Sequence, residues 1–243
     1  MKFLHIIALI IFSSSFIQSH EIGIDFNIGY TNLNMEQVNQ YLNNSESVDL
    51  ESLLIIPNQW NPIGASLIYE LGVSAKLSQF VVRLSGNYLS TNGSWESRDT
   101  IKYINHDIDV STVEILASAG YNIPIYKTAS ILLEGGIGYG FASSEITYIT
   151  RSYRFHNELE NIKHNVSSGY LAGRLRGGFE AKLKWLMLRI VIGYRFANSV
   201  VLTCDSIING EKKENQPVID NNGNELVFDF SGIYYAWGIT VLL

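Results

Sequence analysis

The residue types that could perform acyl transfer or hydrolysis occur together at one place in the sequence. His106, Asp107 and Ser111 supply a base, an acid and a hydroxyl nucleophile within one short segment. A general base must approach its nucleophile to about 3 Å, and spacing along the sequence does not establish that contact. We therefore interpret all three as polar loop residues, assign no catalytic residues and predict that the chain is not an enzyme.

A second candidate is a metal site between two histidines. His156 and His164 have Glu158 and Glu160 between them, and imidazole and carboxylate groups are common metal ligands. The chain has 1 cysteine, Cys204, which excludes a Cys-rich metal site and a disulfide framework. We expect the histidines to be polar loop residues as well, and we predict no bound metal and no cofactor.

Charged residues also recur at alternate positions of otherwise apolar segments. Alternation places them on one face of a strand, which in a closed sheet would line the interior. Charges with little water around them must be paired, and Glu134 and Arg176 fall at similar heights on neighbouring predicted strands. We predict an Arg/Glu network that plugs the interior, with a narrow polar channel as the alternative. The predicted network consists of Glu70, Arg83, Glu114, Glu134, Arg174, Arg176, Glu180, Arg189 and Arg195.

Strict alternation of apolar and polar residues recurs along the whole chain and indicates β-strands. In segment 186–197, for example, apolar residues alternate with Arg189, Gly193 and Arg195. Most of these segments have about 10 to 15 residues, whereas soluble strands average about 5 or 6 and tilted membrane strands need about 9 to 11. Eight strands are predicted, at residues 21–31, 65–77, 80–89, 108–122, 129–142, 169–183, 186–197 and 227–243.

The connections between these segments alternate in length. Aromatic residues gather near both ends of the predicted strands, as they do at the two interfaces of a membrane. A soluble sandwich or a lipocalin-like barrel would explain the alternation equally well, but not the aromatic belts, the strand lengths or the loop asymmetry. The predicted fold class is an all-β, transmembrane, antiparallel up-and-down barrel of eight strands with short periplasmic turns and long extracellular loops. The short turns are 78–79, 124–128 and 184–185, and the long connections are 32–63, 90–107, 143–168 and 198–226.

The start of the chain has the pattern of an export signal. Lys2 carries a positive charge, residues 3–12 are almost wholly apolar, and small polar residues follow. The apolar run is about half as long as a membrane-spanning helix requires. We predict a cleaved signal peptide at residues 1–19 and a single barrel domain at residues 20–243.

The composition excludes some classes of protein. The net charge of -6 and the pI of about 5.4 leave no excess basic surface, so we predict no binding to nucleic acid. Hydrophobic residues make up 47% of the chain, which is too apolar for a disordered protein. The charged fraction of 16% lies below the roughly 25% of soluble domains.

The last strand carries a pattern of its own. The residues Tyr235-Ala-Trp237-Gly-Ile239-Thr-Val241-Leu-Leu243 look like the C-terminal signal read by the barrel assembly machinery, which usually ends in Phe. With the eight alternating segments, they make the whole mature chain resemble the small eight-stranded outer-membrane proteins of Gram-negative bacteria, such as the OmpA transmembrane domain, OmpX and the OmpW group. The resemblance implies a multi-pass barrel in the bacterial outer membrane. It also implies contacts with outer-membrane lipids and lipopolysaccharide, and with the barrel assembly machinery and periplasmic chaperones during biogenesis.

The long connections suggest where such a protein would act. Asn34 with Gln37 resembles a capping box, and Met35, Val38 and Leu42 share one helical face, which predicts a short helix over the barrel mouth. Acidic residues of the first and last connections could hold divalent cations that bridge lipopolysaccharide, or could be a solvated surface. We predict a structural or surface-interaction role through the loops, with an unknown surface ligand. The alternative is a narrow channel for small polar or hydrophobic solutes, and a lipid A-modifying enzyme is less favoured.

Overall fold

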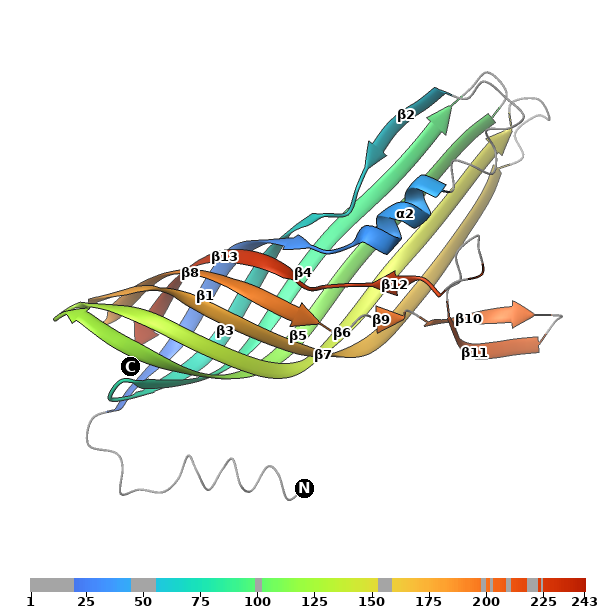
Figure 1. The fold of residues 1–243 in the computed structure, drawn as a ribbon. Coiled ribbons are helices and arrows are strands. Elements are labelled where there is room, and N and C mark those ends of the chain that lie inside the picture. The colour runs from blue at the N-terminus through green and yellow to red at the C-terminus, as the bar shows by residue number, and fades with distance from the viewer. Residues whose placement is uncertain are drawn as a thin grey trace.

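The computed structural model describes residues 20–44, 56–98, 102–152, 159–197, 200–201, 203–208, 211–217, 223 and 225–243. Within these residues the chain is almost entirely β-structure (Figure 1). No helix in this part is long and apolar enough to cross a membrane. The predicted signal peptide, residues 1–19, lies outside the described ranges.

Eight strands of the described chain form a closed antiparallel ring (Figure 1). Each strand pairs with its neighbour in the chain order, and the ring closes because β13 pairs with both β8 and β1. This confirms the predicted all-β barrel of eight strands. The ring strands are β1 (His20–Leu33), β3 (Ala65–Leu77), β4 (Phe80–Arg98), β5 (Lys102–Tyr126), β6 (Ala129–Ser152), β7 (Leu159–Leu183), β8 (Leu186–Ala197) and β13 (Gly232–Leu242).

Short turns join the strands at one end of the barrel. Ser78 and Lys184 begin two of these turns with positive φ angles of 60° and 53°, a backbone conformation that tight hairpins require. The predicted turn 124–128 is too long, because β5 continues to Tyr126 after an irregular pairing at Pro124. Proline has no N–H to donate, so it disturbs the ladder without ending the strand.

Four neighbouring strands are longer than the rest of the ring. β4, β5, β6 and β7 have 19, 25, 24 and 25 residues, whereas β1, β3, β8 and β13 have 11 to 14. Beyond the rim of the barrel, at about Ser90, Ser111 and Ser143, these four strands continue together as an open sheet (Figure 1). We call this part, residues 91–98, 102–110, 144–152 and 159–166, the sheet extension. The prediction of long loops at 90–107 and 143–168 is therefore wrong for the described residues of these segments.

The outward face of the sheet extension explains that error. Asn92, Asp109, Glu145 and Asn165 lie at successive paired positions of β4, β5, β6 and β7, above the apolar outer face of the barrel. The strands continue, but their residues no longer alternate between an apolar outward face and a polar inward face, which is the pattern of a membrane strand. A sequence reading based on that alternation stops where the outer face becomes polar.

Shorter elements surround the barrel mouth. The α2 helix (Glu36–Asn44) follows β1, β2 (Ile56–Asn61) pairs with the far part of β4, and β9 (Val200–Val201) pairs with β12 (Val227–Phe228). The hairpin of β10 (Thr203–Ile208) and β11 (Glu211–Pro217) projects away from β7 (Figure 1). Predicted strand 227–243 is interrupted between β12 and β13, where the Asp229 side chain accepts the Ser231 N–H at 2.9 Å.

The α2 helix and residues 226–230 close the mouth as an apolar cap. Of the three residues predicted to share a helical face, Val38 of α2 and Met35 just before it are buried with Phe228, Phe230 and inward residues of the ring strands, and the side chain of Leu42 lies outside the described part. The predicted capping box is not seen. The helix begins one residue later, with Asn39 N–H donating to the Met35 carbonyl at 2.9 Å, while the Asn34 side chain donates to Asp229 at 2.9 Å.

Candidate functional site

The candidate site is the interior of the barrel, where alternation directs every second side chain. Ten charged residues are buried in the described structure, five carboxylates and five guanidinium groups, so the formal charges cancel. This confirms the buried Arg/Glu network expected from the sequence. The members are Asp25, Glu70, Glu114, Glu134, Glu180, Arg83, Arg174, Arg176, Arg189 and Arg195.

The cluster nearest the short turns is centred on Asp25 of β1. Its carboxylate accepts Arg83 Nε at 2.9 Å and lies 3.4 Å from Arg189 Nη1. Arg189 Nε in turn donates to Glu180 Oε1 at 2.6 Å, and Asn122 donates to the other Glu180 oxygen at 2.8 Å. Asp25 thus joins two arginines that belong to different sides of the ring, β4 and β8.

The middle cluster has two carboxylates and two arginines. Glu134 lies opposite Arg176 in the β6–β7 ladder, with Arg176 Nη2 2.7 Å from Glu134 Oε1. Arg174 Nη2 lies 3.2 Å from the same oxygen, and both arginines also contact Glu70 across the lumen. Arg83 pairs with Glu134 as well, which connects this cluster to the one around Asp25.

The cluster nearest the mouth is built on Glu114 of β5. Arg195 Nε donates to Glu114 Oε1 at 3.1 Å, and the Tyr170 hydroxyl donates to the same oxygen at 2.8 Å. Asn87 Nδ2 donates to Glu114 Oε2 at 3.3 Å. Arg195 Nη1 also donates to the main-chain oxygen of Phe230, so this cluster touches the apolar cap directly.

The arrangement explains how so many charges stay buried. Each carboxylate contacts at least one guanidinium group. In the middle cluster and the cluster nearest the short turns, each arginine contacts two carboxylates. Removing one partner of a buried pair typically costs about 3–5 kcal/mol, because the remaining charge is left uncompensated. The interior is therefore held together by mutual neutralisation and packing, and a single substitution affects several neighbours.

The structure brings together all nine predicted network residues and adds members that the predicted network did not include. Asp25 belongs to the network although the prediction omits it. The predicted network also lacked its neutral partners, namely Asn27, Asn87, Asn122, Tyr170 and Thr240. Each lies at an inward position of its strand, which the alternation indicates, but the alternation does not specify which charge a neutral side chain contacts. Lys182, which shares this face, instead pairs with Glu21 at the exposed end of the barrel.

The hydrolytic candidate does not assemble. His106 faces the inner side of the sheet extension, where its ring lies 5.6 Å from the Trp95 ring centre. Asp107 accepts a hydrogen bond from Asn105 at 2.6 Å, and Ser111 belongs to the opposite, outward face with Ser143. A base on one face of a sheet cannot activate a hydroxyl on the other.

The metal candidate lies largely outside the described structure. His156 and Glu158 fall in an undescribed segment, and for Glu160, His164 and Cys204 only the backbone is described. Within the described residues, no group of three or more potential metal-ligating side chains is found. The acidic connections that could hold cations likewise fall mostly on undescribed residues or side chains.

Comparison with known proteins finds distant likenesses among solved structures. No protein-family model matches the chain, and no curated protein matches it. Two crystal structures of Ail, the attachment invasion locus protein of Yersinia pestis, are similar with a TM-score of 0.40 and 11% sequence identity. The match covers 93% of this chain and 100% of that chain, and one of the structures is a complex with the heparin analogue sucrose octasulfate. At this level of similarity, the architecture of the chain rests on its own ring of paired strands.

Proposed function

We propose that the chain is an outer-membrane barrel with a closed interior, which presents the sheet extension and the mouth segments at the cell surface. The observation that carries the proposal is the contrast between the outward and the inward face of the barrel wall. The outward face is covered with exposed apolar side chains, and the inward face is filled with a neutralised charge network. A soluble barrel would have the opposite arrangement.

The apolar outward face surrounds the ring. Leu71, Leu84, Ile115 and Ile137 come from four consecutive ring strands and are exposed by 57%, 59%, 59% and 77%. Exposed apolar patches of more than a few hundred square ångströms are rare on soluble monomers and mark interaction with membranes or proteins. A continuous band of this kind on a closed barrel matches the alternation of membrane strands, with apolar residues outside and polar residues inside.

The band ends in ordered rows. At the rim, a row with Tyr88 and Phe141 is followed two residues further by Ser90, Ser111 and Ser143, and then by the polar row of the sheet extension. This spatial order, aromatic residues and then hydroxyl and charged groups, is expected at the boundary between the hydrocarbon core and the headgroups and water. The rows support a membrane boundary at the rim, with the sheet extension outside it.

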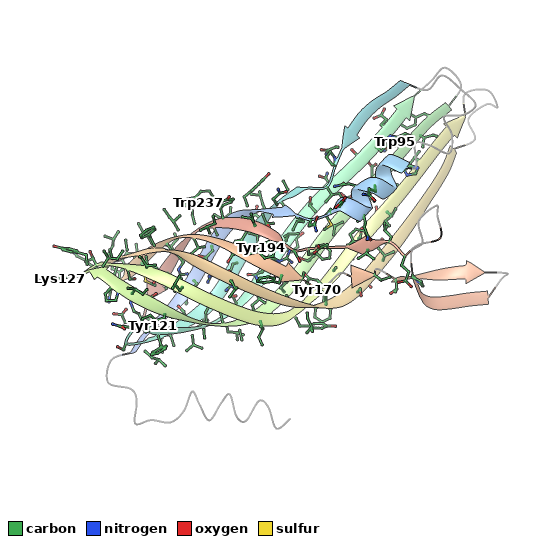
Figure 2. The ribbon with its side chains drawn as sticks, in the orientation of Figure 1. Trp95, Tyr121, Lys127, Tyr170, Tyr194 and Trp237 are labelled. Atoms are coloured by element: carbon green, nitrogen blue, oxygen red, sulfur yellow. The ribbon has the colours of Figure 1, made fainter. Side chains whose placement is uncertain are left out.

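The other end of the band has its own aromatic residues. Tyr121 lies near the end with the short turns (Figure 2). Its ring packs edge-to-face against Phe80, with 5.1 Å between the ring centres. On β6, Ile131 and Phe141 bound the band about ten residues apart, which at a strand tilt of about 40° corresponds to roughly 25 Å along the barrel axis. That height agrees with the roughly 25 Å apolar band of outer-membrane barrels.

The interior supports a closed barrel rather than a channel. An eight-stranded barrel is only wide enough for side chains to fill. Here the charged side chains meet across the lumen, and the apolar cap covers the mouth. Between Glu70 and Glu114 there remains a cavity of about 10 Å³. A continuous path for hydrated ions would require the network to separate.

Conductance in a planar bilayer tests this part of the proposal. Refolded protein would first be shown to be a barrel by heat-dependent migration on a gel, and then be inserted into the bilayer. We expect no steady conductance from the folded, inserted protein. Ohmic steps comparable to those of a porin would contradict the closed barrel and favour the narrow channel.

For the surface role, we propose that the open edge of β7 in the sheet extension accepts an extended segment of a protein partner. Beyond the pair Ala172–Ala197, the described residues supply one ladder partner on that side of β7, Thr203 opposite Ser167. Unpaired strand edges bind extended peptides through main-chain hydrogen bonds. Amide hydrogen exchange with candidate surface proteins tests this: a true partner should protect residues 159–166, and binding without protection there would exclude the edge.

The C-terminal strand supports an assembly role. Tyr235, Trp237 and Ile239 face outward from β13 and are exposed. β13 also closes the ring between β8 and β1, so it is the strand whose placement completes the barrel. We propose that these residues, with Val241 and Leu243, are read by the barrel assembly machinery. Replacing Trp237 and Ile239 with Ser should reduce insertion in cells more than refolding in detergent.

A further inference from the structure

A small cavity inside the barrel is lined in part by residues that carry a buried polar atom with no partner among the described residues. The cavity measures about 10 Å³ and lies between the middle cluster and the cluster at the mouth. Four unpartnered buried atoms belong to residues that line it: Asn27 Oδ1, Asn87 Oδ1, Arg174 Nε and Tyr234 OH. The four residues are 3–6% exposed, so bulk water does not satisfy these atoms.

The chemistry of the four atoms identifies the ligand. Two are acceptors, the amide oxygens of Asn27 and Asn87, and two carry hydrogens to donate, Arg174 Nε and the Tyr234 hydroxyl. A cation would face the hydrogens of Arg174 and Tyr234, and an anion would face the two amide oxygens. A molecule that donates two hydrogen bonds and accepts two fits all four groups.

The volume selects among such molecules. A water needs about 10–15 Å³ of probe-occupied space and two to four polar partners. The cavity has room for about one water, and four of its lining residues carry an unpartnered polar atom, so larger neutral ligands are excluded. Unpartnered buried polar atoms are rare in native proteins and call for an explanation such as a bound water.

We propose that this cavity is a binding site for one structural water, held by Asn27, Asn87, Arg174 and Tyr234. The water donates to the two amide oxygens and accepts from Arg174 Nε and the Tyr234 hydroxyl.

The water also connects two parts of the network. Asn27 Nδ2 donates to Glu70 at 2.9 Å, and Asn87 Nδ2 donates to Glu114 at 3.3 Å. A water between the two amide oxygens therefore links the middle cluster to the cluster that contacts the cap. With it, hydrogen bonds and ion pairs run from the main chain of Phe230 at the mouth to Asn122 near the short turns.

Tyr234→Phe tests the site because a bound water and a dry cavity predict different changes in the stability of the barrel. If the hydroxyl binds a water, the variant loses a hydrogen bond, and the equilibrium constant for unfolding in urea should rise about fivefold. If the hydroxyl is unpartnered in a dry cavity, removing it should leave that constant unchanged or lower it, which would overturn the proposal. Tyr170→Phe is the matched control, since its hydroxyl bonds Glu114 directly and its loss must register in the same assay.

A second measurement remains decisive if the variant does not refold. In the wild-type barrel in detergent micelles, NMR should detect cross-relaxation between a long-lived water and the side-chain amide protons of Asn27 and Asn87. The absence of that signal would overturn the proposal whatever the stability of the variant. Both measurements need only a folded barrel, so they are independent of whether the barrel conducts or binds a partner.

Discussion

Arg195 joins the charge network to the apolar cap through Phe230. Its Nη1 donates a hydrogen bond to the Phe230 main-chain oxygen, and its guanidinium carbon lies 5.9 Å from the centre of the Phe230 ring. The same guanidinium group pairs with Glu114 below. The Phe230 ring stacks on the Tyr170 ring at 5.3 Å, and the Tyr170 hydroxyl donates to Glu114. These contacts join the charge network to the apolar cap.

Replacing Arg195 with Leu should strongly destabilise the barrel. The substitution leaves Glu114 buried with the Tyr170 hydroxyl and the Asn87 amide but no positive charge. We expect the free energy of unfolding, measured by urea titration of refolded protein, to fall by about 3–5 kcal/mol. In the double variant Arg195→Leu with Glu114→Leu, part of this loss should be recovered, because no charge is left unpaired. A double variant less stable than the single one would show that packing, not charge pairing, dominates here.

The cap should contribute stability without controlling conductance. Met35 is 2% exposed and packs into the apolar cluster at the mouth. Met35→Ala should lower the unfolding free energy by about 2–5 kcal/mol, the range for emptying a buried site of this size. The variant should stay silent in a planar bilayer, since the charge network beneath still fills the lumen. If the variant conducts ions, the cap and not the charge network blocks the lumen.

Two glycines on opposite faces of the wall should respond differently to alanine. A Cβ on Gly238 would meet the amide oxygen of Asn27 inside the barrel, whereas a Cβ on Gly177 would make an ordinary 3.4 Å contact with Leu133. We expect Gly238→Ala to cost about 1–3 kcal/mol in urea unfolding, because Asn27 must move away from Glu70. Gly177→Ala is the control and should change the stability little. Equal effects would mean that strand propensity, not crowding, determines both.

The sequence predicts the ring and much of the network for one physical reason. Alternation with a period of two assigns each residue to a face without knowledge of the tertiary structure. Glu134 and Arg176 are neighbours in the ladder, so their pairing follows from the assigned faces and heights alone. The pairing of Asp25 with Arg83 joins strands that are not adjacent, β1 and β4. Such contacts across the lumen depend on how far each side chain reaches, which the sequence pattern does not specify.

The sheet extension is the part of the fold that the sequence pattern could not predict. Asp109 and Glu145 lie on the outward face of strands β5 and β6, where Asp109 is exposed and Glu145 is half-buried. Ile108 and Ile146, next to them along the chain, lie on the inward face and are buried in the cluster that includes the cap. The apolar inner residues pack only because α2 and residues 226–230 cover them. The covering segments are distant in sequence, so nothing local to residues 90–107 or 143–168 distinguishes a covered sheet from a polar loop.

A charge placed on the outer wall distinguishes a membrane barrel from a soluble one. Ile137 lies near the middle of the apolar band on β6 and is 77% exposed. In a bilayer, Ile137→Arg should cost about 2–4 kcal/mol, as an arginine near the midplane does in other outer-membrane barrels. In water the same substitution would replace an exposed apolar residue with a charged one, and the stability should change by less than about 0.5 kcal/mol. Urea unfolding in lipid vesicles measures the difference.

Asn92→Arg provides the matched control for that measurement. Asn92 is exposed on the outward face of β4, but it lies in the sheet extension beyond the row of serines. If the rim is the membrane boundary, an arginine there stays in water or among headgroups and should be nearly neutral. A large loss for Ile137→Arg with little change for Asn92→Arg would place the bilayer around the ring and the sheet extension outside it. Small effects at both positions would contradict the membrane barrel, and large effects at both would move the boundary above the rim.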